Sequence, residues 1–186
     1  YQQIDLITSR DCTLRCTYCY LQKHADSAYS IEKITQGLDA LLTQFDTLRE
    51  RYQDLTPEES GKIRGYTKGV VLSFYPEPWV NIPQTDKLVR EALKVLYRHP
   101  YYAEHFMVSM GTNGVRLDQP IPILEHILSN LSIAVTIDGI EEAHDLYRRF
   151  PNGDPSWKIV KANILKYQQK YNITSTKITL GPQTLK

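Results

Sequence analysis

Short apolar runs and amphipathic stretches alternate along the 186 residues of the chain. A strand is typically a run of roughly four to eight apolar and β-branched residues, whereas a surface helix repeats its apolar residues every three or four positions. These patterns predict strands at residues 3–8, 69–74, 106–110, 132–137 and 177–180. They predict helices at residues 31–48, 88–96, 122–129 and 155–171, with Ser30 as the N-cap of the first and Asp154 as that of the last.

Strands and helices therefore alternate from the first predicted strand to the last. This order is typical of a parallel sheet with right-handed crossovers, and two architectures fit it: a doubly wound open sheet and a (β/α) barrel. In both, functional residues gather on loops at the carboxyl ends of the strands. Residues 50–69 are polar and lack an apolar period, so we expect an insertion or surface loop there. Because the chain starts at Tyr1 and stops just after its fifth strand, we expect it to be part of a longer protein.

The composition is that of an ordinary globular domain, with 41% apolar and 23% charged residues. Lysine and arginine number 22 against 21 aspartate and glutamate, and no basic stripe is interleaved with aromatic residues. We therefore expect no nucleic-acid partner. No run approaches the ~18 apolar residues of a membrane helix, and the N-terminus lacks the basic-then-apolar order of a signal peptide. We accordingly expect no membrane partner and a cytoplasmic location.

All the cysteines of the chain, Cys12, Cys16 and Cys19, lie in one short segment. An odd number at such short spacing makes a poor disulfide framework and favours metal or redox chemistry. A tetrahedral zinc site needs a fourth ligand; His24 is a candidate, but Tyr29 stands where a zinc knuckle would place its last cysteine. Three thiolates on a [4Fe–4S] cluster would instead leave one iron open to a small molecule. Inert thiols and a non-catalytic zinc or redox-sensing module are the alternatives.

The loop sequence CTLRCTYCY, placed after a first strand, resembles the C-x3-C-x-φ-C signature of the radical S-adenosylmethionine (radical SAM) superfamily. YPEP after the second strand stands where that superfamily usually has Gly-Gly-Glu-Pro, and TNG follows the third strand. TIDGIEEAHDLYRRF resembles a segment of sulfatase-maturing and related peptide-maturing enzymes. The resemblance extends from about Ile4 to Leu180. It implies an α/β fold, a partial (β/α)6 TIM-like barrel with about five βα units, and one core domain over residues 1–186 that is truncated at its C-terminal end.

The resemblance also implies roles for individual residues. Cys12, Cys16 and Cys19 would hold a [4Fe–4S] cluster, at which S-adenosylmethionine (SAM) is reductively cleaved to a 5′-deoxyadenosyl radical. The residues expected at SAM are Tyr18 near the adenine, Glu77 near the methionine amine, Thr136 through its hydroxyl, Arg148 at the carboxylate, and Asn113 and Asp138 on the neighbouring loops. A planar guanidinium such as that of Arg148 suits a carboxylate.

Some of these residues also have simpler interpretations. Asn113 and Asp138 each precede a glycine, so turn formation is an alternative role for both. His144 and Asp145 we expect to shape their loop rather than to act. Tyr75–Pro76 replaces the two glycines of the usual motif, so the backbone there is less free than in the family.

From the resemblance we predict a radical SAM enzyme that modifies a peptide or protein side chain. Its electrons would come from a donor such as flavodoxin or ferredoxin. A radical enzyme acting on a small metabolite or an RNA base is the alternative within the same chemistry.

Overall fold

A five-stranded parallel sheet organises the computed structural model, which describes residues 1–7, 9–20, 29–173 and 175–179. The strands are β1 (Gln2–Ile7), β2 (Val70–Tyr75), β3 (Phe106–Thr112), β4 (Leu131–Thr136) and β5 (Ser175–Lys177). They lie in the order β1-β2-β3-β4-β5, and each neighbouring pair is parallel. A doubly wound sheet would reverse its strand order at a switch point, so this sequential order decides between the two predicted architectures. The fold is a partial, TIM-like α/β barrel.

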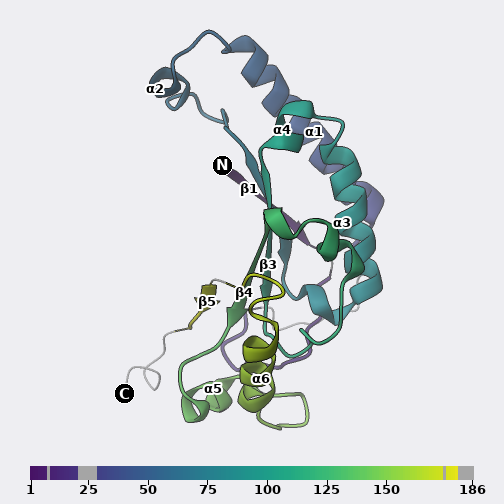
Figure 1. The fold of residues 1–186 in the computed structure, drawn as a ribbon, viewed down its shortest axis with the longest axis vertical. Coiled ribbons are helices and arrows are strands. Elements are labelled where there is room, and N and C mark those ends of the chain that lie inside the picture. Colours follow the sequence, from purple (N-terminus) through teal and green to yellow (C-terminus); the bar gives the residue numbers. More distant parts are fainter. Residues whose placement is uncertain (8, 21–28, 174, 180–186) are drawn as a thin grey trace.

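Helices connect the strands, and α1, α3 and α4 lie along one side of the sheet (Figure 1). The α-helices are α1 (Ile31–Arg51), α2 (Pro57–Ser60), α3 (Ile82–Leu96), α4 (Pro100–Glu104), α5 (Glu141–Tyr147) and α6 (Trp157–Tyr167). The 3₁₀ helices are η1 (Pro78–Val80), η2 (Pro122–His126) and η3 (Leu128–Asn130). α1 packs against α3, while α5 and α6 pack together near the carboxyl ends of the strands.

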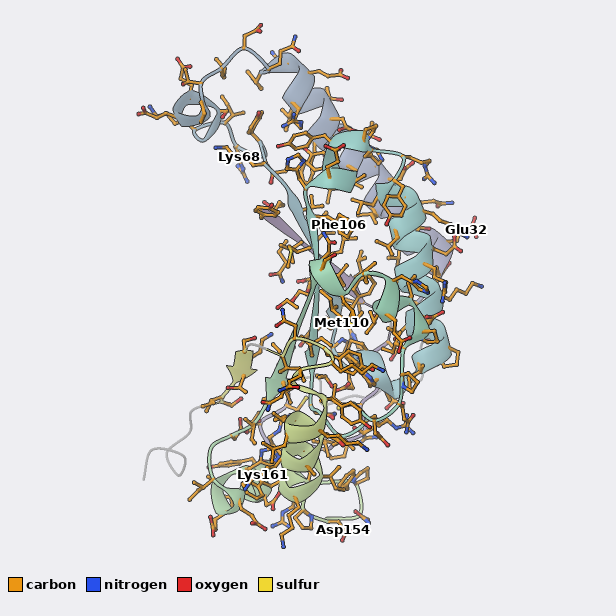
Figure 2. All side chains as sticks on the ribbon, viewed as in Figure 1. Glu32, Lys68, Phe106, Met110, Asp154 and Lys161 are labelled. Carbon is orange, nitrogen blue, oxygen red and sulfur yellow. The ribbon has the colours of Figure 1, made fainter. Side chains whose placement is uncertain are left out.

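Capping and burial explain the two long helices. The Ser30 hydroxyl accepts a hydrogen bond from Lys33 N–H at the start of α1, as predicted, and Asn81 caps α3 through Gln84 N–H. Both helices bury an apolar face against the sheet, in a core that includes Leu38, Leu42, Leu72, Leu88, Ala92, Phe106, Val108, Met110 and Ile133 (Figure 2 labels Phe106 and Met110). Burying a leucine or isoleucine side chain contributes about 1.5–3 kcal/mol, so each large apolar residue of this helix-facing layer stabilises the fold.

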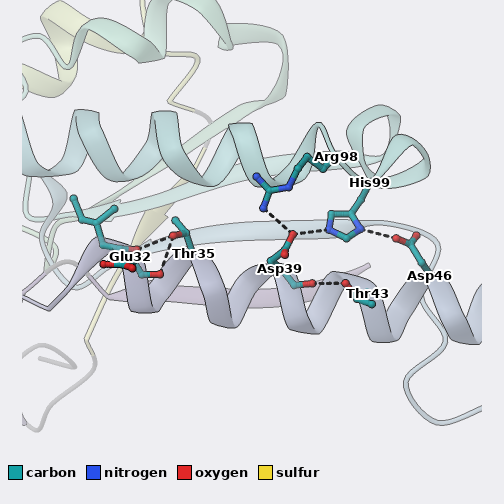
Figure 3. A network of polar contacts seen from close by, with 8 residues as sticks. Glu32, Thr35, Asp39, Thr43, Asp46, Arg98 and His99 are labelled. Atoms are coloured by element: carbon teal, nitrogen blue, oxygen red, sulfur yellow. Dashed lines mark hydrogen bonds and ion pairs between the residues drawn. The ribbon is translucent and has the colours of Figure 1, made fainter.

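A histidine holds α1 to the far end of α3 (Figure 3). His99, between α3 and α4, places Nδ1 2.5 Å from Asp46 Oδ2 and Nε2 3.1 Å from Asp39 Oδ1. Arg98 donates to the same Asp39 oxygen at 2.9 Å. Because α3 runs antiparallel to the strands, this network lies at the amino-terminal edge of the sheet, opposite the edge that carries the cysteine loop.

The structure corrects several predicted helices. Residues 122–129 form the 3₁₀ helices η2 and η3 rather than one α-helix. The last helix begins at Trp157, because Pro155 instead forms an isolated antiparallel bridge with Arg149. Asp154 therefore does not cap it, and its N-cap position is Ser156. The apolar pattern does not predict α4 or α5, since each is too short to display a period.

The polar insertion and the strand limits also differ in detail. Residues 50–69 include the short helix α2, whose capping box joins Thr56 and Glu59. β3 extends to Thr112, and β5 comprises Ser175–Lys177. The predicted limits at residues 8 and 180, like His24, lie outside the described residues. Among the described helices, none has the length and apolar character needed to cross a membrane.

Candidate functional site

The predicted functional loops meet at the carboxyl edge of the sheet. The cysteine loop follows β1, and the segments YPEP, TNG and DG stand at the carboxyl ends of β2, β3 and β4. Backbone hydrogen bonds attach the cysteine loop to the segment after β4, since Arg15 N–H donates to Arg149 O at 2.8 Å and Thr17 N–H donates to Tyr147 O at 3.0 Å. Loops that are far apart in the sequence are therefore fixed to one another.

Three free thiols lie in the loop after β1. Cys12, Cys16 and Cys19 are half-buried, and Cys19 N–H donates to Cys16 O at 3.0 Å, which closes a turn between them. Burial raises the pKa of Cys12 to about 11. Burial also raises the pKa of Cys16, although the positive charge of Arg148 opposes that rise. A thiolate at either position therefore requires a positively charged partner, such as a metal centre.

Glu77 is buried behind the loop that follows β3, with 3% of its surface exposed. Its Oε1 accepts hydrogen bonds from the Thr112 hydroxyl at 2.8 Å and Trp79 N–H at 3.2 Å, and its Oε2 accepts from Asn113 N–H at 2.7 Å. Burial raises the pKa of the carboxyl group, and these donors oppose the rise. Both carboxylate oxygens of Glu77 thus accept hydrogen bonds from the protein itself. These bonds join the loop after β2 to the end of β3. Contact between Glu77 and a methionine amine stays a prediction.

Asn113 connects the end of β3 to the cysteine loop. Its Nδ2 donates to Cys12 Sγ at 3.3 Å and to the Thr13 hydroxyl at 2.9 Å. Its Oδ1 accepts from Val115 N–H at 2.9 Å, so the residue also forms a turn, as the alternative interpretation expected. Glu77, Asn113 and Cys12 together form a strap, hereafter the Glu77–Asn113 strap, across the loops of the first three strands.

Tyr18, Asp138 and Arg148 form a second connection between loops. The Tyr18 hydroxyl donates to Asp138 Oδ2 at 2.5 Å and accepts from Arg148 Nη1 at 2.6 Å, while Arg148 and Asp138 are 4.0 Å apart. Asp138 Oδ1 also accepts from Thr179 N–H at 2.9 Å. Asp138 is 0% and Arg148 6% exposed, so this buried ion pair depends on its hydrogen-bond partners. Burial and the hydrogen bond to Asp138 raise the pKa of Tyr18 to about 12.

His144 and Asp145 shape the loop that carries this pair, as expected. Asp138 N–H donates to His144 Nδ1 at 3.2 Å, and His144 Nε2 lies 3.0 Å from Ser156 Oγ, which donates to Arg148 O at 2.7 Å. Burial lowers the pKa of His144, which favours the neutral ring that such an acceptor role requires. Asp145 Oδ1 accepts from the backbone N–H groups of Ser156 and the next residue, each at 2.9 Å, and so caps α6. Sequence reasoning missed Ser156, because nothing in the motif marks a buried serine.

Thr136 has a different position from the other predicted residues. It ends β4, is half-buried, and lies opposite Lys177 in the ladder between β4 and β5. Its neighbours along β4 alternate between the two faces, and buried Val135 lies on the helix-facing side. Thr136 therefore lies on the opposite face of the sheet, at its carboxyl edge.

The donor set fits an iron–sulfur cluster beside an anionic group. The thiols of one loop are soft ligands, and a cuboidal cluster binds each thiolate through a separate iron. A site for a single metal ion would instead direct three or more side chains at one point. Among the described residues, no three His, Cys, Asp or Glu side chains are arranged in that way. Arg148 Nε is buried and has no hydrogen-bond partner within the described ranges. A buried, unpartnered guanidinium N–H fits a bound carboxylate that completes the site.

Comparison with protein-family models identifies the family of the chain. The model of the radical SAM superfamily matches residues 6–186. The chain belongs to the radical SAM superfamily. In this radical SAM chain, the matched range begins in β1 and includes the cysteine loop together with the segments at the ends of β2, β3 and β4.

Solved structures share the fold of this radical SAM chain. Native anSMEcpe, an anaerobic sulfatase-maturating enzyme, with bound AdoMet (SAM) and the Cp18Cys peptide, aligns with a TM-score of 0.65 and 17% identity over 96% of this chain and 42% of that chain. Native anSMEcpe with bound AdoMet gives a TM-score of 0.63 and 18% identity over 95% and 43% of the two chains. The likeness at this identity concerns the fold, and the chain spans less than half the length of these structures. No curated protein matches the sequence.

Proposed function

We propose that this chain is the core of an enzyme that cleaves SAM reductively and modifies a side chain of a peptide or protein. Membership of the radical SAM superfamily supports the class of reaction. The observation that carries the proposal is the position of the cysteine loop. Asn113, which follows β3, contacts Cys12, and Tyr18 within the loop contacts Asp138 and Arg148, which both follow β4, so the thiols are held against the loops of two other strands.

The three cysteines would hold a [4Fe–4S] cluster, which when bound supplies low-potential electron transfer to SAM. The remaining residues determine where the cluster ligands lie. Asn113 Nδ2 fixes the Cys12 sulfur, and the buried Glu77 carboxylate fixes the Asn113 backbone. Glu77 thus serves as a positioning residue, and the hydrogen bond from Asn113 also places a donor against a ligand sulfur.

Arg148 would bind the carboxylate of SAM through the guanidinium N–H that is free of partners among the described residues. Tyr18 and Asp138 hold the guanidinium in place through the hydroxyl bridge and the ion pair. The half-buried Thr136 hydroxyl, at the end of the same strand that leads to Asp138, would contact the same cofactor. Burial of these groups excludes water from one side of the site and strengthens their electrostatic contacts.

A peptide or protein substrate is the choice that the neighbours favour. Native anSMEcpe has been solved with bound AdoMet and with either the Cp18Cys or the Kp18Cys peptide, the latter at 19% identity and a TM-score of 0.62. The net charge of +1 provides little attraction for an RNA substrate. The proposed enzyme would take electrons from a ferredoxin or flavodoxin, and its reduced thiols suit the cytoplasm.

Iron content and SAM cleavage test this function. Anaerobically reconstituted full-length protein should be brown, contain about four irons per chain, and cleave SAM when reduced with dithionite. Cys16→Ala should lose the iron and the cleavage, since two thiolates do not hold the cluster. Thr17→Ala is the matched control, because its backbone N–H rather than its side chain bonds to Tyr147 O. A colourless protein with one zinc, or a Cys16→Ala variant that retains iron and cleavage, would contradict the proposal.

A further inference from the structure

The face of the sheet that points away from α1 and α3 carries a row of polar residues. Strand residues alternate between faces, and the register places Leu6, Phe74, Met110 and Ile133 in one buried row on the helix side. The row one position earlier must point to the other face, and its members are Asp5, Ser73, Ser109 and Ser132. Parallel sheets usually carry apolar residues on both faces because both are covered by helices. Three serines in one row therefore place hydroxyl groups near the middle of this face, hereafter the open face.

Lys177 extends across the open face. It pairs with Thr136 in the ladder between β4 and β5, yet its Nζ lies 3.5 Å from the position that a Cβ atom of Gly111 would occupy. Gly111 belongs to β3, so the lysine side chain crosses β4 to reach this place. The residue of β4 in register with Gly111 is Ala134. Glycine and alanine at these two positions leave the space in which the lysine side chain lies.

The ammonium group of Lys177 has no ion-pair partner among the described residues. The two carboxylates of the site already have partners: Asp138 contacts Tyr18, Thr179 and Arg148, and Glu77 accepts hydrogen bonds from Thr112 and Asn113 at the end of β3. A lysine ammonium has three donors and attracts a carboxylate as a point charge. Within the described part of the chain, the open face thus presents an ammonium group that has no ion pair, beside small residues and hydroxyl groups.

We propose that Lys177 determines substrate specificity by receiving the carboxylate of an acidic residue in the peptide. This inference rests on the proposed function and names the chemistry of its substrate. Gly111 lies two residues before Asn113, whose side chain contacts Cys12, so a carboxylate bound at Lys177 anchors the peptide next to the cysteine loop. The hydroxyls of Ser109 and Ser132, roughly 7 Å further along the same face, provide additional donors to the peptide backbone.

Binding of paired peptides tests this proposal in full-length protein loaded with cluster and SAM under anaerobic conditions. The probes are dye-labelled, amidated hexapeptides of glycine, serine and one cysteine, in which one position carries Glu or, in the partner peptide, Gln, scanned along the sequence. Fluorescence anisotropy measures their dissociation constants. We expect at least one Glu peptide to bind about tenfold more tightly than its Gln partner, as for a hydrogen bond to a charged group.

Variants assign the preference to one residue. Lys177→Met should remove the preference for the Glu peptide, and Lys177→Arg should retain it. A third peptide with Lys at the same position tests Lys177→Glu, which should bind this Lys peptide more tightly than the Glu peptide. Lys87→Met is the matched control, because Lys87 is an exposed lysine of α3 on the other side of the sheet. Iron content and the dissociation constant for SAM are measured in parallel and should be the same in all five proteins.

The outcomes separate this proposal from the proposed function. Equal binding of Glu and Gln peptides by the parent, or a preference that persists in Lys177→Met, would overturn the role of Lys177 while cluster content and SAM cleavage still support the enzyme. A loss of SAM affinity in Lys177→Met with an unchanged peptide preference would assign the ammonium to the SAM carboxylate and also overturn the proposal. A parent protein that contains no iron and does not cleave SAM would contradict the proposed function itself.

Discussion

Replacing Tyr18 with phenylalanine removes a single hydroxyl that holds two buried charges. That hydroxyl donates to Asp138 Oδ2 at 2.5 Å and accepts from Arg148 Nη1 at 2.6 Å. Hydrogen bonds to charged groups contribute about 1.5–3 kcal/mol each, so the two bonds set an upper limit of roughly 3–6 kcal/mol. The actual loss should be smaller, because 36% of Tyr18 is exposed and water can replace the hydroxyl, and because the 4.0 Å gap between Arg148 and Asp138 can close. We expect a decrease of about 2 kcal/mol in the free energy of unfolding.

Urea unfolding followed by circular dichroism measures this change. The midpoint should fall while the slope m stays the same, and the melting temperature should fall by about 4–8 °C for a domain of this size. Tyr20→Phe is the control, since Tyr20 lies two residues away and is 76% exposed. Equal stability of the two variants, within about 0.5 kcal/mol, would refute the argument that the Tyr18 hydroxyl supports the buried pair.

The same residue predicts a dependence on alkaline pH. The pKa of Tyr18 is raised from 10.0 to about 12 in the folded protein, so folding favours the protonated phenol. Its contribution is fully present below pH 10 and is lost as the pH rises toward about 12. Parent and Tyr18→Phe should therefore converge in stability across this range, and a constant difference would contradict the interpretation.

Three further predictions concern the loops around the site. Arg148→Ala should weaken SAM binding in equilibrium dialysis about ten- to a hundredfold without loss of iron. Arg149→Ala should leave SAM affinity and iron content unchanged, because the Arg149 guanidinium bonds to an exposed loop carbonyl. Asp145→Ala should lower the free energy of unfolding by about 1–2 kcal/mol through loss of the cap on α6, and Asp154→Ala should not. Glu77→Ala should destabilise the protein by about 2–4 kcal/mol in urea unfolding and broaden the cluster's electron paramagnetic resonance signal, while Glu77→Gln should recover part of both.

The sequence predicted which loops would meet, because alternating strands and helices bring the carboxyl ends of all parallel strands to one edge. It also placed the proposed cluster ligands together, since one short loop contains every cysteine. The sequence did not predict the orientation of Glu77. Its hydrogen-bond partners are Trp79 in η1, Thr112 at the end of β3 and Asn113 directly after it, and only packing brings them together. Lys177 carried no signal either, because a lysine in a short exposed strand looks like ordinary surface until its side chain is seen to cross β4.

The cap of α6 shows the same limit. Asp154 directly precedes a proline and a serine, which is a local signature of a helix start. The structure uses Asp145 instead, a residue of α5 that reaches the first N–H groups of α6. Local pattern predicted that a helix begins here, but only the packing of α5 against α6 determines which carboxylate caps it.

The Glu77–Asn113 strap has a consequence for the order in which the protein is assembled. The contact between Asn113 and Cys12 joins positions 101 residues apart, and the contact between Tyr18 and Asp138 joins positions 120 residues apart. Closing such long loops has a larger entropic penalty than forming local contacts, so we expect these contacts to form after the local helices. A nascent chain that has emerged only as far as α1 therefore contains all three thiols but none of their supports. We therefore expect the proposed cluster to be inserted after β3 and β4 have docked, and partial unfolding of β4 to release the cysteine loop while α1 and α3 remain packed.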